Sequence, residues 1–318
     1  MKNFSLAIIG DIHGFWTSVD TEYFSKSEYD AVLFTGDLGT YRTESTFRVA
    51  QEISKIRKPC YLVPGNHDTT SLFQLLAEIL HLPSFLTWPG LPWHLRRYSR
   101  FRKELGDIRI CEYSLHKEIG GLTILGARPL SMGFRLNFLP FLRKKFSVSN
   151  MADSVRKLDS LGREAAESGE DLLVLAHNGP AGLGNKASDI WGCDFRKEEG
   201  DFGDTDLATF LEHAASYGRT PNVVIAGHMH HHTKRSVLFR IWKVRKSGTL
   251  FINAARVPRV FRDAEGISWH HHVRLRRKDG AWDAEAVYLR NGKEEVFPLP
   301  ELLEREKASV KEEVSLLP

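Results

Sequence analysis

Short apolar runs alternate with polar segments along the first 230 residues, and each run ends at a glycine or an alanine with polar residues behind it. Continuous apolar runs of this length, rich in Val, Ile and Leu, are typical of strands that are buried on both faces. The five predicted strands are LAIIG (residues 6–10), AVLFTG (31–36), CYLVPG (60–65), LLVLA (172–176) and NVVIAG (222–227).

Helical patterns fill several of the gaps between these strands. Residues 42–57, 71–80, 151–166 and 204–217 each place apolar side chains on one side of a helix, and Asp204 is suited to cap the last of them. Because strand and helix alternate, the sequence predicts an α/β fold with helices outside the sheets. Residues 248–260 and 271–289, the latter turned at residues 278–280, predict antiparallel strands instead.

The length and charge pattern predict one domain with a basic middle. We expect residues 1–298 to form this domain, with a basic insertion or cap at about residues 84–147. Residues 92–103 carry five positive charges and residues 135–145 carry four, without an acidic residue in either stretch, whereas the other 35 Lys and Arg face 40 Asp and Glu. Residues 299–318 predict a charged amphipathic C-terminal helix packed on its own domain.

Composition indicates a globular protein in a reducing compartment. Hydrophobic residues make up 42% and charged residues 26% of the chain, which is ordinary for a soluble domain. No apolar run reaches the roughly 18 residues of a membrane span, so we expect no membrane partner. The three cysteines are scattered, and nothing resembles a targeting peptide. We therefore expect a cytoplasmic protein, or a plastid stromal one if this is a mature plastid chain.

The residues that follow the predicted strands carry the candidate chemistry. In α/β sheets, ligands gather at the carboxyl ends of the strands, and here all five ends offer oxygen or imidazole donors. Residues two apart in an extended chain point the same way, so Asp11 and His13 can reach one site together, as can His228 and His230. The candidate residues are Asp11, His13, Asp37, Asn66, His67, Asp68, His177, His228 and His230.

This ordered series resembles that of the calcineurin-like metallophosphoesterases. The matching motifs are Asp11-x-His13, Gly36-Asp37, Gly65-Asn66-His67-Asp68, His177 and Gly227-His228-x-His230. The resemblance spans residues 6–230 and implies a four-layer sandwich of two stacked mixed sheets flanked by helices. Further stretches (AHNGPAGLG, GCDF, GDFGD and NAARVPR) resemble a poorly characterised subgroup of cyanobacteria and plant plastids.

The resemblance also implies a role for each site residue. Asp11, His13 and His230 would hold a first metal ion, and Asn66, His177 and His228 a second. Asp37 would bridge the two ions. His67 would stand over the phosphate as the proton donor to the leaving group, with Asn66 also contacting substrate and Asp68 orienting His67.

The donor chemistry agrees with a two-metal hydrolase. Two divalent cations about 3.5–4 Å apart activate water and clamp phosphoryl oxygens. A mixed nitrogen and oxygen set without thiolate suits Mn²⁺ or iron best, with Zn²⁺ as an alternative. His67 is suited to proton transfer because imidazole titrates near neutral pH. We therefore expect an enzyme that hydrolyses phosphate esters, first a small phosphomonoester.

Departures from the family pattern narrow the class. The Ser/Thr protein phosphatases of this superfamily carry Gly-Asp-x-x-Asp-Arg-Gly and end the third motif in Glu. Here the stretch from Gly36 reads GDLGTYR, and the third motif ends in Asp68. A protein phosphatase is therefore not expected. The remaining alternatives are a phosphodiesterase or nuclease acting on cyclic nucleotides or nucleic acid, and a scaffold that has lost catalysis.

Several weaker features have two interpretations each. Arg128 and Arg256 follow predicted strands and could bind phosphate oxygens, or could be structural arginines. The acidic residues 189–206 could line the substrate entrance, or Asp204 could simply cap a helix. The triplet at residues 270–272 suggests extra metal ligands or ordinary histidines. The basic, aromatic residues 93–103 fit a nucleic-acid track, a lid over a small anion, or a solvated face.

Overall fold

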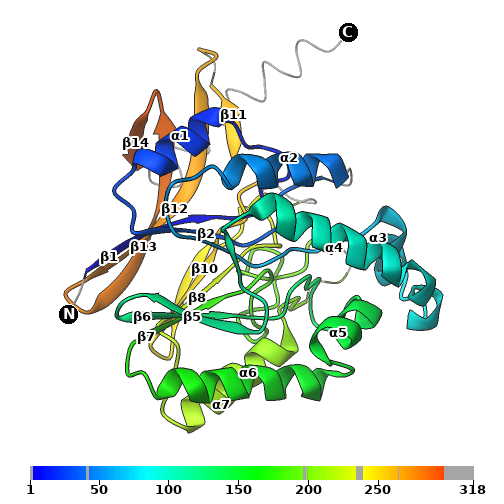
Figure 1. Cartoon of the computed structure of the whole chain (residues 1–318). Coiled ribbons are helices and arrows are strands. Elements are labelled where there is room, and N and C mark those ends of the chain that lie inside the picture. The colour runs from blue at the N-terminus through cyan, green and yellow to red at the C-terminus, as the bar shows by residue number, and fades with distance from the viewer. Residues whose placement is uncertain are drawn as a thin grey trace.

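The computed structural model describes residues 3–40, 43–195, 198, 200–233, 239–263 and 265–296. Over these residues the strands form two mixed sheets, stacked face to face with helices on both outer sides (Figure 1). The predicted four-layer α/β sandwich is thus confirmed. The predicted helix at residues 299–318 lies outside the described residues.

The first sheet has the order β14-β13-β12-β1-β2-β3-β4, with β11 paired to β12. Strands β1, β2, β3 and β4 run parallel, whereas β12 joins β1 antiparallel. The predicted hairpin turns at Asp279 and Gly280, between β12 and β13. The bounds are β1 Phe4–Ile9, β2 Ala31–Phe34, β3 Cys60–Leu62, β4 Arg109–Ile110, β11 Val260–Arg262, β12 Ser268–Lys278, β13 Ala281–Arg290 and β14 Lys293–Val296.

The second sheet has the order β5-β6-β7-β8-β10-β9. Its central strands β6, β7, β8 and β10 are parallel, and the two edge strands are antiparallel to their neighbours. The bounds are β5 Ser114–Ile119, β6 Leu122–Gly126, β7 Asp171–Leu175, β8 Val223–Ala226, β9 Lys243–Lys246 and β10 Thr249–Asn253.

The period of two along each strand explains why the predicted strands are apolar throughout. In β1, Leu6 and Ile8 face the second sheet, while Ala7 and Ile9 face the helices outside. Both faces are therefore buried. Helices α1 (Ser18–Lys26), α2 (Thr43–Ile53) and α4 (Leu91–Leu105) cover the first sheet, and α5 (Leu139–Phe146), α6 (Met151–Ala166) and α7 (Thr205–Ser216) cover the second.

The structure corrects the expected insertion at residues 84–147. This segment supplies β4 to the first sheet and β5 and β6 to the second, so it belongs to the body of the sandwich. Most of its basic residues lie on α4 and α5. What projects from the body is α3 (Leu72–Ile79) with two short 3-10 turns, η1 (Ser84–Leu86) and η2 (Trp88–Gly90), at the right of Figure 1. Among the described residues, no helix combines the length and apolar character that crossing a membrane demands.

Candidate metal centre

The candidate ligands lie at the carboxyl ends of β1, β2, β3, β7 and β8, as expected from the sequence. Four of them have positive φ: Asp11 (40°), His13 (44°), Asp37 (52°) and His228 (67°). This left-handed backbone costs free energy for a residue with a Cβ and is found where the surrounding structure enforces it, commonly at functional sites. The loops are therefore held in one conformation that turns these side chains toward a common point.

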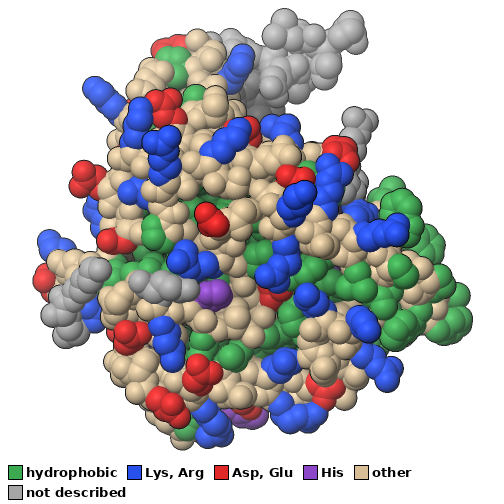
Figure 2. Space-filling view, in the orientation of Figure 1, with side chains coloured by type: hydrophobic (Ala, Val, Ile, Leu, Met, Phe, Trp, Pro, Cys, Tyr) green, Lys and Arg blue, Asp and Glu red, His purple; other side chains and the backbone are tan. Residues whose placement is uncertain are grey.

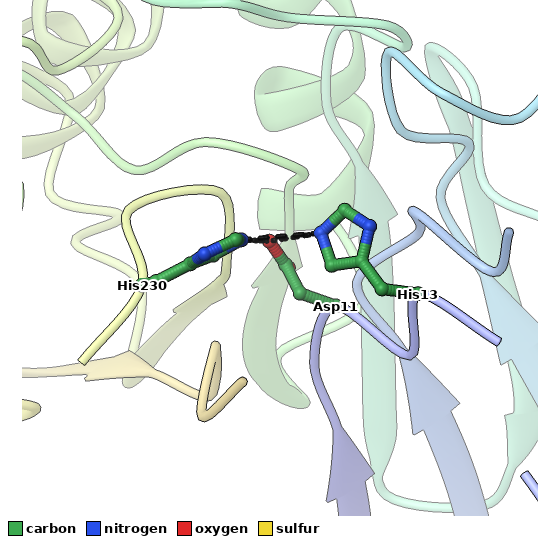
Figure 3. Close-up of side chains that lie close together, drawn as sticks. All are labelled: Asp11, His13 and His230. Carbon is green, nitrogen blue, oxygen red and sulfur yellow. Dashed lines mark hydrogen bonds and ion pairs between the residues drawn. The ribbon is translucent and has the colours of Figure 1, made fainter. Parts of the chain in front are cut away.

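The first donor group consists of Asp11, His13 and His230 (Figure 3). Asp11 Oδ2 lies 3.3 Å from His230 Nε2, and the Nε2 atoms of His13 and His230 are 3.1 Å apart. All three donor atoms lie within 4.8 Å of one another. Two imidazoles and one carboxylate this close form a site that divalent transition-metal ions accept.

The second donor group consists of Asp37, His177 and His228. His177 Nε2 lies 3.6 Å from Asp37 Oδ2 and 2.8 Å from Asn66 Oδ1, so the amide of Asn66 joins the group. Asp37 Oδ2 is also 3.9 Å from His13 Nε2. One carboxylate oxygen thus faces a histidine of each group, which is the position required of a bridging ligand.

Hydrogen bonds behind the ligands fix which atoms face the centre. His177 Nδ1 lies 2.6 Å from the carbonyl of Thr35, and His13 Nδ1 lies 3.2 Å from that of Gly39. A carbonyl only accepts, so each Nδ1 carries the proton and leaves the Nε2 lone pair toward the centre. The backbone amide of His67 donates to Asp37 Oδ1 at 2.8 Å, which leaves Oδ2 for the ions. The residues present therefore fit two divalent cations.

The ionisation of most of these groups favours metal binding, whereas for His177 burial is outweighed by the charges of Asp37 and Asp11, which raise its pKa. Burial, then the charge of His177, lowers the pKa of His228 to about 3. Burial also lowers the pKa of His13. Burial opposes ionisation of Asp11, but the hydrogen bond and charges of neighbouring histidines outweigh it and lower its pKa. Neutral imidazoles beside an ionised carboxylate are the ligand forms that bind cations.

The side chain of Asp68 accepts hydrogen bonds from backbone amides. Its Oδ1 accepts the amide of Leu38 at 2.7 Å, and its Oδ2 accepts those of Asp37 at 3.0 Å and Gly65 at 2.8 Å. The carboxylate is fully buried and ties the loop after β2 to the loop after β3. The contacts of Asp68 therefore place it in the support of both loops, whereas the resemblance implied a role in orienting the His67 ring.

His67 stands at the edge of both donor groups. Its side chain is 14% exposed, and its Nε2 lies 4.0 Å from Asp37 Oδ2. The ring packs edge-on against His13, with 5.3 Å between ring centroids. It lines the main cavity together with Asn66, in reach of a group bound over the ions.

That cavity opens from the donor groups and has a volume of about 790 Å³. His13, Asp37, His228 and His230 form its floor. Its walls are mostly apolar, with a few charged side chains between them. The wall residues include Leu75, Glu78, Ile79, Met132, Phe134, Arg135, Asp194, Phe195, Phe202 and Met229. These residues come from α3 and from loops. The sequence indicated those of residues 189–206 as one interpretation, but not the others, because contacts between distant segments leave no local signal.

The two predicted phosphate-binding arginines do not line this cavity. Arg128 is 1% exposed, with its Nε 2.8 Å from Asp206 and its Nη2 3.0 Å from Asp204. Arg256 is also buried, bonds the carbonyl of Pro258 and stacks over the ring of Phe261 at 4.5 Å. Both match the structural interpretation. At the cavity wall it is Arg135 that offers a guanidinium.

The acidic segment divides its residues between two tasks. Asp194 and Phe195 line the cavity, as one interpretation expected of this segment. Asp204 stands at the N-cap position of α7, yet its carboxylate does not cap the helix. It accepts instead from Ser131 at 2.5 Å and from Asn178 at 3.2 Å, and it pairs with Arg128.

The histidine triplet at residues 270–272 lies away from the donor groups, within β12. His270 Nδ1 bonds the buried Asp20 at 2.9 Å, and Asp20 also accepts from Arg259 at 2.8 Å. His272 Nε2 bonds the hydroxyl of Tyr29 at 2.9 Å. These structural hydrogen bonds join β12 to α1 and to the segment that follows α1, and they favour the interpretation of the triplet as ordinary histidines.

A two-sheet α/β sandwich with carboxylates and imidazoles gathered at its strand ends is the architecture of a metal-dependent phosphoesterase. Residues 4–232 match the family model of the calcineurin-like phosphoesterases, and the chain belongs to this family. The family implies divalent metal ions, which agrees with the two donor groups found here. No curated protein matches the chain.

Solved structures are similar to this chain at low sequence identity. TT1561 of Thermus thermophilus is 9% identical with a TM-score of 0.51, covering 89% of this chain and 98% of its own. GAP50 of Plasmodium, described as the anchor in the inner membrane complex, is 10% identical with a TM-score of 0.47, covering 97% and 95%. Vps29 of Entamoeba histolytica, complexed with zinc, is 12% identical with a TM-score of 0.38, covering 92% and 97%.

Proposed function

We propose that this protein hydrolyses phosphate esters, with two divalent cations held by the two donor groups. The observation that carries the proposal is the position of Asp37, whose Oδ2 faces His13 at 3.9 Å and His177 at 3.6 Å while Oδ1 is fixed by a backbone amide. Two cations so placed supply Lewis acidity and neutralise the charge of phosphoryl oxygens. Mn²⁺ or iron fits the mixed donors best, with Zn²⁺ as an alternative.

The chain itself positions the ester and moves the proton. Asn66 turns its carbonyl oxygen toward His177, so its amide N–H groups point away and can donate to a phosphoryl oxygen. His67 reaches into the cavity beside Asp37 and can give a proton to the departing alkoxide. Arg135 adds a positive charge at the wall, where it attracts a phosphate before chemistry.

We propose a phosphomonoester as the first substrate class and a small phosphodiester as the second. The cavity walls are largely apolar, which suits an ester with an apolar leaving group better than a polyanionic strand. The basic side chains of α4 do not line the cavity, and Arg100 and Arg102 contact Glu44, Glu104 and Tyr98 instead. A nuclease track or a lid over the site is therefore not favoured. The intact donor set likewise favours catalysis over a scaffold.

The cysteines support the proposal of a reducing compartment. Cys60, Cys111 and Cys193 are all buried free thiols. Free thiols fit a reducing compartment, such as the cytoplasm or the plastid stroma.

The test is hydrolysis of p-nitrophenyl phosphate by metal-free protein to which Mn²⁺ is returned. We expect activity to appear with close to two metal equivalents by elemental analysis. The Asp37→Asn variant should lose activity and metal, because a neutral amide bridges cations poorly. The matched control is Asp283→Asn, an exposed aspartate that pairs with Lys243 on the surface. Activity without added metal, or full activity in Asp37→Asn, would exclude the proposed centre.

A further inference from the structure

Helix α3 exposes many of its apolar side chains. Leu72, Phe73, Leu76 and Ile79 turn outward, whereas the two polar residues, Gln74 and Glu78, turn inward together with Leu75 and Ala77. Gln74 caps the helix with Ser71 and bonds His94, whereas Glu78 bonds the amide of Phe138 and the side chain of Asn137. An apolar helix face normally packs on a core, so an outward apolar face indicates an interface.

The apolar face of α3 continues across η1 and η2 to the start of α4. Figure 2 shows this surface as a green patch at the right, where Figure 1 places α3. We call it the α3 patch. Its exposed apolar side chains are Leu72, Phe73, Leu76, Ile79, Leu80, Leu82, Phe85, Leu86, Trp88 and Trp93. The described part of the chain has no other cluster of exposed large apolar side chains of this size.

Positive charge borders the α3 patch. No acidic residue occurs between Ile79 and Lys103, a stretch that includes five Arg and Lys. Helix α5, which like η2 packs against α4, exposes Arg143, Lys144 and Lys145. In Figure 2, blue side chains lie above and below the green surface. A second copy docked through the same patch would bring these positive borders together, so the charge favours an anionic occupant.

The α3 patch is continuous with the cavity over the donor groups. Ile79 belongs to both, since it lines the cavity and is also exposed on the patch. Met132, Phe134 and Met229 line the same cavity, beside polar side chains such as Glu78 and Arg135. An apolar chain that leaves a phosphate at the donor groups can therefore contact apolar side chains of the cavity and of the α3 patch.

We propose that the α3 patch docks on an anionic lipid surface and that the substrate is a phosphate ester of a lipid, presented to the cavity from that surface. Phe, Leu and Trp side chains insert at the level of the headgroups, and the bordering Arg and Lys side chains bind anionic headgroups. Docking of this kind needs no membrane-spanning helix, and the described residues contain none. The substrate part of this inference rests on the proposed phosphoesterase function, whereas the docking part does not.

The docking test is flotation of the full chain with two kinds of vesicle. We expect binding to phosphatidylcholine vesicles that contain about 30 mol % phosphatidylglycerol, and much weaker binding to phosphatidylcholine alone. The variant Phe85→Ser/Trp93→Ser should bind about 10- to 100-fold more weakly, since two large apolar side chains are lost. These side chains are 68% and 71% exposed and lie outside the cavity, so folding and soluble turnover should not change.

The matched control removes two exposed apolar side chains elsewhere on the surface. Val19→Ser/Ile241→Ser changes residues that are 49% and 47% exposed, and it should bind vesicles as the wild type does. A second variant, Arg143→Glu/Lys144→Glu, should bind the anionic vesicles less tightly and lose most of the salt dependence of binding. Equal losses in the control and in Phe85→Ser/Trp93→Ser would overturn the docking surface.

The substrate part is tested by phosphate release from phosphatidic acid in the same vesicles, with p-nitrophenyl phosphate as the soluble comparison. We expect Phe85→Ser/Trp93→Ser to lose about tenfold or more on the lipid and nothing on the soluble ester. Hydrolysis of the soluble ester with no release from the lipid would overturn the lipid substrate and leave the proposed function standing. Vesicle binding with neither ester hydrolysed would support docking and count against the proposed function.

Two other occupants of the patch give different results. Concentration-dependent dimers that disappear in Phe85→Ser/Trp93→Ser, without vesicle binding, would assign the patch to self-association and overturn the inference. A full chain that fails to float, beside a chain ending at Val296 that floats, would assign the patch to residues 297–318 and overturn docking by the full chain.

Discussion

Replacing Arg128 with Met separates a structural arginine from a substrate-binding one. In the structure its guanidinium is the cation that faces two buried carboxylates, Asp204 at 3.0 Å and Asp206 at 2.8 Å. Methionine fills much of the same space but leaves both carboxylates uncompensated. Breaking a buried pair in this way costs about 3–5 kcal/mol of unfolding free energy. For a chain of this size the melting temperature should fall by roughly 4–8 °C.

The loss should grow with pH. Burial raises the pKa of Asp204, the charge of Arg128 lowers it, and the charge of Asp206 raises it again. The balance is a pKa raised to about 7. A carboxyl whose folded pKa is raised destabilises the fold as pH rises from its unfolded pKa to its folded one. Without Arg128 this pKa rises further, so the difference between variant and wild type should be larger at pH 8 than at pH 6.

The matched control is Arg135→Met, at the cavity wall. Its side chain is 32% exposed and lies 3.6 Å from Glu78, so the stability cost should be about 1 kcal/mol or less. Arg135→Met should instead raise KM for a phosphate ester, since attraction present before chemistry is lost. The assay pairs thermal unfolding at both pH values with kinetics on p-nitrophenyl phosphate. The structural interpretation of Arg128 fails if Arg128→Met melts with the wild type and raises KM.

Three further changes test other parts of the molecule. His67→Ala should keep both metal ions but lose about 10²–10⁴ in kcat on alkyl phosphates and far less on p-nitrophenyl phosphate, whose leaving group needs no proton; equal losses would argue against proton donation. Asp68→Ala should lower the melting temperature and the metal affinity together, because three backbone amides lose their acceptor, and unchanged metal titration would contradict this. Burial raises the pKa of Glu112 to about 7, so the unfolding free energy of the wild type should fall from pH 5 to pH 8. In Glu112→Gln, whose side chain can still accept from Tyr98, urea unfolding should show a smaller dependence on pH.

The parts of this molecule that sequence predicts are those with a regular period. Strand β1 reads as a continuous apolar run because both of its faces are buried, and α6 begins and ends at the residues where its apolar pattern does. The donors could be placed together because they follow strands that end at one edge. Helix α1 was not predicted, since its buried residues are Asp20 and Phe24, and a buried aspartate gives no apolar signal.

The rest depended on contacts between distant segments. Arg128 follows a predicted strand, and nothing local shows that Asp204 and Asp206 lie against it. Residues 84–147 were expected to form an insertion or cap because their positive charge differs from the charge of the remaining chain. The positive side chains mark the solvent side of α4 and α5. The pairing of β4 with β3 depends on backbone hydrogen bonds, which do not depend on side-chain charge.

Asp68 accepts three backbone amides and so holds together the loops after β2 and β3, which carry donors. The spacing of these loops therefore does not depend on which residues serve as ligands. The distance between the loops after β2 and β3 is set by a carboxylate behind the site, one layer away from the ions. A ligand carried by these loops, such as Asn66, can therefore be exchanged by mutation while the spacing of the loops is kept. This arrangement makes the chain a suitable starting point for engineering metal preference, in which ligand changes are screened on a frame that needs no redesign.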